Sequence, residues 1–266
     1  MRPSSLFEGV AQRLCIYLNA GCPPLDTHLF TAGYQRWSSS ARNALLSVTH
    51  YRQAESVEPG TVIAKFASAN ESSVLKKITG LPLEGFVETN AKPVYIHRIV
   101  RYFVKALDFI PLFRASNGTM GKSEDYKLFT FVKQEQVAIT AALNSTLFYW
   151  FWRSHCDGFH CGYRDVYSFP WDVGKSNIIR ERLGELLHKL MVTLRKTSER
   201  RTIKTKAGGI EYQEFYPKDC KTIIDEIDVA LAEHHGFTEE ELDFIINYDV
   251  KYRMGLSGGS GEDDGD

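Results

Sequence analysis

The densest cluster of metal-ligating residue types is the stretch SHCDGFHCGY, where His155, Cys156, His160 and Cys161 lie within seven residues. Imidazole nitrogens and thiolates are the usual ligands of structural zinc, which needs four donors in a tetrahedron. Natural sites normally take pairs of ligands from separated segments, and one short loop cannot easily surround an ion. We therefore expect a structural turn here and assign no metal site.

A second set, Asp108, Asp125 and Lys127, loosely matches the two acids and one lysine that hold a divalent ion in many restriction nucleases. The pattern is permissive and often arises by chance. A nuclease subunit therefore stays an alternative interpretation.

Other catalytic signatures are incomplete in the sequence. The pattern Gly-x-Ser-x-Gly occurs only in the glycine-rich tail, at residues 255–259, where the glycines neither follow a strand nor open a helix, and Gly174-Lys175-Ser176 lacks the upstream glycine of a phosphate-binding loop. The chain contains no complete catalytic apparatus, so we assign no catalytic residue.

A basic and aromatic set remains. Cations neutralise phosphates and aromatic rings stack on exposed bases, so this mixture suits nucleic acid, although each residue alone could be an ordinary surface side chain. The candidate DNA-binding residues of this kind are Lys76, Lys77, Lys92, Tyr95, Arg98, Lys122, Arg164, Arg200, Arg201 and Lys204.

The first half of the chain predicts mixed α and β elements. Alternating apolar residues predict a β-hairpin from residues 12–18 and 28–34, and further strands between residues 92 and 131, on either side of the loop RASNGTMGKSED. Serine-initiated runs predict short helices in SSSARNALLSV and NESSVLKKI.

The second half predicts helices. Residues 134–152 are apolar on every side of a helical wheel, which indicates one buried helix, and residues 177–197 carry a single apolar stripe. A further helix should end at Gly236, and Thr238 with Glu241 forms a capping box for the next. The stretch RKTSERRTIKTKAGG has six cations and one acid, and we expect a mobile basic loop.

The composition is that of a folded protein, with 43% apolar and 24% charged residues. No run is long enough to cross a membrane and no secretory signal is present, so we expect a cytoplasmic protein without a membrane partner. Five cysteines favour reduced thiols. Four acids lie in the tail GLSGGSGEDDGD, so residues 1–255 carry a net charge of +3, against −1 for the whole chain.

Five local patterns, in order along the chain, resemble a known family. They are RPSSLFEGVAQRLCIYL, YQRWSSSAR, LNSTLFYWFW, GYRDVYSFPW and DEIDVALAEHHGFTEEELDFIINYDVKYRMG. Together they resemble the C-terminal part of adenine-specific DNA methyltransferases of the restriction-modification type, with a TaqI-like specificity domain. The resemblance covers residues 2 to about 255.

The resemblance implies a division of labour. In this family a Rossmann-like domain binds S-adenosylmethionine and a following domain recognises the target, while an adenine is flipped out and methylated. The family's Asn-Pro-Pro-Tyr or Asn-Pro-Pro-Phe motif does not occur in this sequence, and the glycines of the tail GLSGGSG, which include a Gly-x-Gly, neither follow a strand nor open a helix as the donor turn does. The chain should therefore bind no cofactor itself and should not methylate DNA alone. Phe7 matches the family's aromatic residue that stacks on the flipped base, and could instead plug the hairpin.

The remainder of the chain matches the specificity region. There the helix at 134–152 would form a platform, Asn144 and Ser145 would be either internal hydrogen-bonding residues or DNA contacts, and Arg164 would contact phosphate or base. The expected class is α+β, with a hairpin remnant of the methyltransferase sheet, a mixed target-recognition region and a helical C-terminal part. The corresponding boundaries are 1–55 for the end of the catalytic domain, 56–175 for target recognition, 176–255 for helices with the basic loop, and 256–266 for a disordered acidic tail.

The sequence thus predicts a DNA-binding target-recognition portion of an adenine-specific methyltransferase, with double-stranded DNA as its partner. Besides a nuclease, the alternative is a specificity protein that docks on a separately encoded methyltransferase polypeptide.

Overall fold

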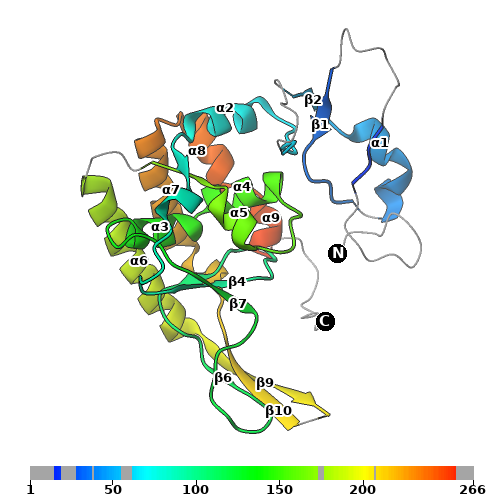
Figure 1. Ribbon diagram of the computed structural model, residues 1–266. Helices are drawn as coiled ribbons and strands as arrows, with labels where there is room; N and C mark the ends of the chain where they lie inside the picture. Colours follow the sequence, from blue (N-terminus) through cyan, green and yellow to red (C-terminus); the bar gives the residue numbers. More distant parts are fainter. Residues whose placement is uncertain are drawn as a thin grey trace.

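The computed structural model describes residues 15–18, 28–37, 39–54, 62–172, 177–206 and 208–255. Over these ranges the chain is α+β, as expected, with a helical body and several small antiparallel sheets (Figure 1). The structure does not test whether any of these strands derives from a Rossmann-like sheet.

The N-terminal pairing differs from the expected hairpin. Strand β1 (Phe30–Ala32) pairs with β2 (Tyr51–Gln53), whereas Cys15–Leu18 is not in a strand and its four residues are exposed. The prediction that residues 12–18 pair with 28–34 is thus wrong for the residues described. The chain between β1 and β2 forms the expected helical run, as η1 (Ser39–Ala44) and α1 (Leu45–Val48).

A three-stranded sheet lies at the centre of the mixed region. Its order is β5 (Ala106–Leu107), β4 (Val94–His97) and β7 (Tyr126–Phe129), all antiparallel. The expected helix before it is α2 (Ala69–Lys77), which begins with a capping box between Ser68 and Glu71. Shorter elements surround the sheet: β3 (Leu81–Pro82), η2 (Leu83–Phe86), α5 (Tyr163–Tyr167) and β8 (Pro170–Trp171), with β3 paired to β8.

The buried segment forms two helices instead of one. Helix α3 (Gln136–Leu143) ends at Asn144, and α4 (Thr146–His155) begins after Ser145, whose hydroxyl accepts the Phe148 N–H at 3.0 Å. Asp228, from the later helix α7 (Lys221–His235), accepts the first two N–H groups of α4, from Thr146 at 3.1 Å and Leu147 at 2.9 Å. A helix can start inside the core because both caps satisfy its free N–H groups.

The remaining helices follow the sequence closely. They cover α3 and α4 (Figure 1): α6 (Asn177–Thr197), η3 (Pro217–Cys220), α7 (Lys221–His235), α8 (Glu239–Ile246) and α9 (Val250–Arg253). Gly236 ends α7 in the left-handed conformation at φ 66°, and Thr238 with Glu241 forms the capping box of α8, both as predicted.

The expected mobile basic loop is instead a β-ribbon. Strands β9 (Glu199–Thr205) and β10 (Gly208–Glu214) pair along their whole length, and β6 (Phe113–Arg114) joins β10 from the other side. We call β6, β9 and β10 the arm; it projects away from the helical body (Figure 1). Gly208 permits the turn because its φ of 124° is one that side-chain-bearing residues rarely adopt.

Candidate nucleic-acid interface

The register of the arm sorts its side chains onto two faces. Residues directly opposite each other in an antiparallel pair share a face, and successive residues alternate. Thr202 lies opposite Glu211, and Glu211 lies opposite Arg114. One face, here called the cationic face, therefore carries Arg114, Arg200, Thr202, Lys204, Glu211 and Gln213. The other, here called the apolar face, carries Phe113, Glu199, Arg201, Ile203, Ile210, Tyr212 and Glu214.

On the cationic face, two arginines share one acid. The Glu211 carboxylate lies 3.4 Å from Arg114 Nη1 through Oε2 and 3.8 Å from Arg200 Nη1 through Oε1. The Arg114 and Arg200 side chains are 51% and 74% exposed, so both guanidinium groups are open to solvent beside the carboxylate. Lys204 is exposed on the same face. Three cations and one acid leave this face positive.

Among the described residues of the apolar face, Arg201 is the only cation, and acidic side chains neutralise it. Arg201 lies 2.9 Å from Glu199 and 2.9 Å from Glu214, and it donates to the Tyr216 hydroxyl at 2.8 Å. The Tyr216 hydroxyl and the two carboxylates raise the pKa of Arg201. Arg200 and Arg201 are adjacent in sequence, yet the strand places them in opposite electrostatic surroundings.

The other predicted cations lie on separate elements. Lys77 on α2 donates to the Gly236 carbonyl at 3.0 Å and to Glu241 at 2.6 Å, so it joins α2 to α8. Arg98 is half-exposed and pairs with Asp125 at 3.0 Å. The remaining predicted cations, all exposed, are Lys76 on α2, Lys92 before β4, Lys122 between β6 and β7, and Arg164 on α5. Lys122 lies next to the arm, because Met120 is bridged to Arg114, whereas Lys76, Lys92 and Arg164 belong to segments outside the arm.

Three predicted contact residues lie inside the protein. Tyr95 is 7% exposed, Asn144 4% and Ser145 1%. The Asn144 amide donates to the Ala106 carbonyl at 2.8 Å and accepts the Ala106 N–H at 3.1 Å. Asn144 and Ser145 are thus internal hydrogen-bonding residues, the first of the two roles that the sequence left open, and the prediction that these three residues contact DNA does not fit their burial. Phe7, the predicted base-stacking residue, lies outside the described residues.

The cluster at 155–161 forms a turn. Asp157 accepts the N–H groups of Phe159 at 2.6 Å and His160 at 2.8 Å. Burial lowers the pKa of His155 to about 4 and raises the pKa of the Cys161 thiol, which disfavours the thiolate that a metal ion needs. Within the described ranges, no three His, Cys, Asp or Glu side chains are placed to hold a metal ion.

The nuclease set is spread across the central sheet. Leu107 of β5 lies opposite Tyr95 of β4, so the next residue, Asp108, falls opposite position 94. Tyr126 of β7 lies opposite His97, so the preceding residue, Asp125, falls opposite position 98. The two acids therefore lie opposite positions four residues apart on β4, roughly 13 Å along the strand, too far to share an ion. Asp108 instead pairs with Arg195 at 3.1 Å, and Lys127 lies 5.1 Å from the centre of the Tyr163 ring.

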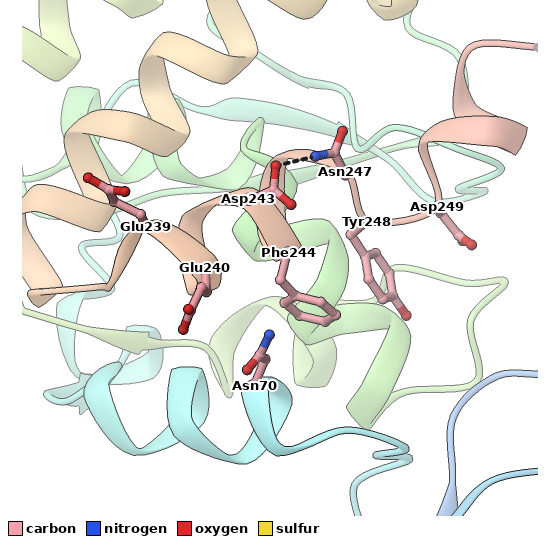
Figure 2. Close-up of a pocket in the computed structure, with 8 residues that line it drawn as sticks. All are labelled: Asn70, Glu239, Glu240, Asp243, Phe244, Asn247, Tyr248 and Asp249. Carbon is pink, nitrogen blue, oxygen red and sulfur yellow. Dashed lines mark hydrogen bonds between the residues drawn. The ribbon is translucent and has the colours of Figure 1, made fainter.

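One cavity, of about 720 Å³, opens beside α8 (Figure 2). Its lining is acidic: Asn70, Glu239, Glu240, Asp243, Phe244, Asn247, Tyr248 and Asp249. Glu239 and Glu240 belong to the first turn of α8, where carboxylates offset the helix dipole. This lining repels phosphate, so the cavity does not suit a nucleic-acid backbone.

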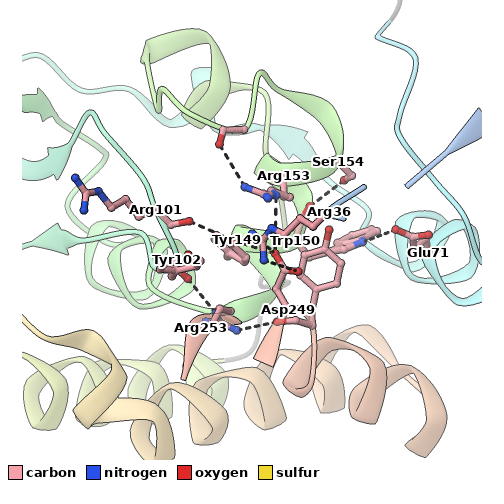
Figure 3. Close-up of polar contacts among 12 residues, drawn as sticks. Arg36, Glu71, Arg101, Tyr102, Tyr149, Trp150, Arg153, Ser154, Asp249 and Arg253 are labelled. Carbon is pink, nitrogen blue, oxygen red and sulfur yellow. Dashed lines mark hydrogen bonds and ion pairs between the residues drawn. The ribbon is translucent and has the colours of Figure 1, made fainter. Parts of the chain in front are cut away.

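Three of the family-like motifs meet at Asp249 (Figure 3). Its carboxylate accepts from Arg36 at 3.2 and 3.5 Å and from the Tyr149 hydroxyl at 3.2 Å, and lies 3.9 Å from Arg153 Nε. Asp249 has a φ of 56°, unusual for a residue other than glycine. YQRWSSSAR supplies Arg36, the C-terminal motif supplies Asp249, and LNSTLFYWFW supplies Tyr149.

Two arginine–tyrosine contacts link residues 34–36 to the helical body beside Asp249. We call the whole cluster the Asp249 junction; it comprises Tyr34, Arg36, Tyr149, Arg153, Asp249, Tyr252 and Arg253. The Arg36 guanidinium lies 4.0 Å from the centre of the Tyr252 ring, and that of Arg153 lies 3.7 Å from the Tyr34 ring. Each side thus contributes one cation and one ring. Residues 34–36 are thereby held against the helical body.

Arg253 extends the junction into the core. It is 3% exposed, donates to the Tyr102 carbonyl and to the Thr146 hydroxyl, each at 3.0 Å, and lies 4.3 Å from the centre of the Phe103 ring. Burial raises the pKa of the neighbouring Asp228 carboxyl to about 6. These contacts hold the fold together, and the arginines that make them are not available to a ligand.

Comparison with known proteins identifies no relative: no family model, curated protein or solved structure matches the chain. In the part of the chain that the structure describes, no helix has the length and apolar character needed to span a membrane.

Sequence reasoning missed Arg114, Glu211 and the residues of the Asp249 junction. The alternation of Arg200, Thr202 and Lys204 against Arg201 and Ile203 is a period of two, and it could have predicted the strand.

Proposed function

We propose that this chain is the DNA-binding target-recognition portion of an adenine-specific DNA methyltransferase of the restriction-modification type. The observation that carries the proposal is the projecting arm, whose outer strand β9 is exposed at all seven residues and presents a positive face. S-adenosylmethionine would bind to a catalytic part bearing the motifs that this sequence lacks.

The shape of the arm supports a DNA partner. An antiparallel ribbon can enter the major groove of B-DNA, which is about 12 Å wide, and strands serve this purpose in several DNA-binding folds. Cations on one face of such a ribbon can neutralise phosphates while the ribbon lies along the groove. The acidic cavity beside α8 and the neutralised apolar face offer phosphates no comparable surface.

Salt-dependent binding is the direct test. The full chain is titrated against a fluorescently labelled duplex of about 30 base pairs containing several adenine contexts, at salt concentrations from 50 to 200 mM. We expect the logarithm of the affinity to fall linearly with the logarithm of the salt concentration, with a slope of about −0.9 for each phosphate neutralised. Absence of binding at 50 mM salt would contradict the proposal.

A methylation assay tests the remaining part of the proposal. The chain alone should transfer no methyl group from labelled S-adenosylmethionine to the duplex. A methyltransferase polypeptide carrying the donor turn and the Asn-Pro-Pro-Tyr motif should show altered site preference or activity when the chain is added. Saturable binding of S-adenosylmethionine by the isolated chain would contradict this division of labour.

We propose, as a second candidate, that the chain acts as a specificity protein docking on such a separate methyltransferase. The supporting observation is a set of exposed apolar side chains near the N-terminal elements, where a two-stranded sheet is marginal alone. These are Ile16, Tyr17, Leu18, Phe30, Leu46, Val48, Tyr51, Val62 and Ile63. Co-expression with the methyltransferase should yield a complex that the double variant Phe30→Asp, Tyr51→Asp weakens, while Ile203→Asp on the arm leaves it intact.

A further inference from the structure

We propose that Arg114 and Arg200 form a clamp for one backbone phosphate of a nucleic acid, and that Glu211 is a built-in competitor for the same position. This inference rests on the proposed function and deepens it. It assigns the phosphodiester contact to one face of the arm, adds Arg114 to it, and excludes Arg201 from it.

The geometry that points to a clamp is the bridged carboxylate. Two guanidinium groups from different strands, β6 and β9, approach opposite oxygens of the single Glu211 carboxylate, at 3.4 and 3.8 Å. Guanidinium groups bind carboxylates and phosphates with the same fork geometry. A phosphodiester presents two charged oxygens to the same pair of cations, so it can occupy the place that Glu211 holds in the free protein.

The strength of the existing contacts allows this exchange. Both distances exceed those of close charge-assisted hydrogen bonds, and both arginines are at least half exposed. Ion pairs of this kind are weak because water screens them. A DNA backbone that brings several phosphates to Arg114, Arg200 and Lys204 together can therefore displace the carboxylate.

Arg201 provides a matched comparison. It is adjacent to Arg200 and is exposed to a similar degree as Arg114, but it lies on the apolar face between Glu199 and Glu214. Those two acids outnumber it and lie at 2.9 Å. A phosphate approaching this face meets net negative charge, so Arg201 should not contribute to DNA binding.

The experiment measures the affinity of the full chain for the labelled duplex and the salt slope of each variant. Arg200→Ala and Arg114→Ala should each lower the affinity about three- to tenfold at 100 mM salt and make the slope shallower by about 1, equally for duplexes of different sequence. Arg200→Lys keeps the charge but not the guanidinium fork, so it should keep the salt slope and lose part of the affinity. Arg201→Ala should change the affinity less than twofold.

Glu211→Gln separates the clamp from simple charge attraction. If Glu211 competes with phosphate, the variant should bind DNA about three- to tenfold more tightly, and the gain should disappear in the double variant Glu211→Gln, Arg200→Ala. If Glu211 instead only positions the arginines, the variant should bind more weakly, and that result would overturn the proposal. Circular dichroism and thermal unfolding of each variant check that the arm and the fold persist.

The outcomes distinguish the two levels of inference. Absence of salt-dependent binding by the wild-type chain defeats the proposed function and the clamp together. Binding by the wild type with equal effects of Arg200→Ala and Arg201→Ala defeats the clamp alone. Inorganic phosphate, added as a competitor at matched ionic strength, should displace the duplex more strongly than chloride does from the wild-type chain but not from Arg200→Ala. An equal excess over chloride in both proteins would place the phosphate contact elsewhere and would overturn the clamp.

Discussion

The arginines of the arm and those of the Asp249 junction differ in their exposure and in their partners. In the arm, Arg114 and Arg200 are exposed and share one weakly held carboxylate. In the junction, Arg153 and Arg253 are 1% and 3% exposed, and they contact carbonyls, hydroxyls and aromatic rings. The residue type is the same, so the surroundings determine whether an arginine can bind a ligand or instead stabilises the fold.

The difference follows from desolvation. Removing a guanidinium from water costs several kcal/mol, which acceptors and a nearby carboxylate must offset. In the junction this offset is incomplete, because Arg153 Nε and Arg253 Nη2 are buried without a hydrogen-bond partner. A buried arginine is therefore committed to its partners, and losing one partner is costly. An exposed arginine keeps its hydration, so exchanging a carboxylate for a phosphate costs little.

The largest expected effect is at Asp249. Replacing Asp249 with Ala removes the carboxylate that faces Arg36 and Arg153 and leaves the buried Arg153 charge without its ion-pair partner. We expect a loss of about 3–5 kcal/mol in the free energy of unfolding, measured in urea. Asp249→Asn keeps the shape and tolerates the positive φ, so it should lose less. If the Ala variant loses under about 1 kcal/mol, the junction is not what holds residues 34–36 to the body.

Asp228 predicts a specific pH dependence of stability. Burial raises its pKa to about 6, whereas the unfolded chain titrates near 3.9. Between these values the native state binds more protons than the unfolded state, so this group makes stability fall as the pH rises from about 4 to 6, by up to about 3 kcal/mol. As the pH rises from about 4 to 6, the stability of the Asp228→Asn variant relative to the wild type should increase. Above about pH 6 the difference between their unfolding free energies should no longer change.

Glu241 supplies the control of opposite sign. Burial opposes its ionisation, but donation from Lys77 at 2.6 Å and Ser73 at 2.6 Å lowers its pKa overall. Its contribution is present above the unfolded value of about 4.3 and is lost as the pH falls. Glu241→Gln should therefore lose less relative to wild type at low pH, and matching curves for both variants would contradict these assignments.

The sequence predicted elements whose determinants are local. The apolar stripe of residues 177–197 predicted α6 at its observed ends, and Gly236 and the Thr238–Glu241 pair predicted the boundaries of α7 and α8. These signals lie within one or two helical turns of the residues they control.

Features that depend on distant residues were missed. The break between α3 and α4 was missed in a uniformly apolar run because only one of its caps, Ser145, is local, and the other, Asp228, lies over 80 residues away. The Arg36–Asp249 pair spans 213 residues. The arm was taken for a loop because its high charge density hid the alternation of β9, and because pairing with β10 and β6 compensates for its lack of an apolar core.

A smaller effect is expected at the tip of the arm. A Cβ at Gly208 would lie 3.0 Å from the Ser116 carbonyl oxygen, and the φ of 124° is itself strained for alanine. Gly208→Ala should cost about 1–3 kcal/mol locally, so the amides of β9 and β10 should exchange hydrogen faster while those of α6 do not. Gly118→Ala is the control, because its φ is also positive but no atom lies within 4 Å of the added Cβ. Equal effects would mean that backbone strain, and not the contact with Ser116, decides the result.

The smallest expected effect on stability is that of removing the exposed cations of the arm, and it tests the contrast with the junction arginines directly. Arg200→Ala removes an exposed side chain whose ion pair with Glu211 is screened by water, and Lys204→Ala removes an exposed side chain on the same face. Each should change the free energy of unfolding by less than about 0.5 kcal/mol. Arg153→Ala, measured beside them, should destabilise the fold strongly because that side chain is 1% exposed and lies on the Tyr34 ring. An arm cation that proved as costly to remove as Arg153 would be a structural residue, and its predicted role toward phosphate would lose its physical basis.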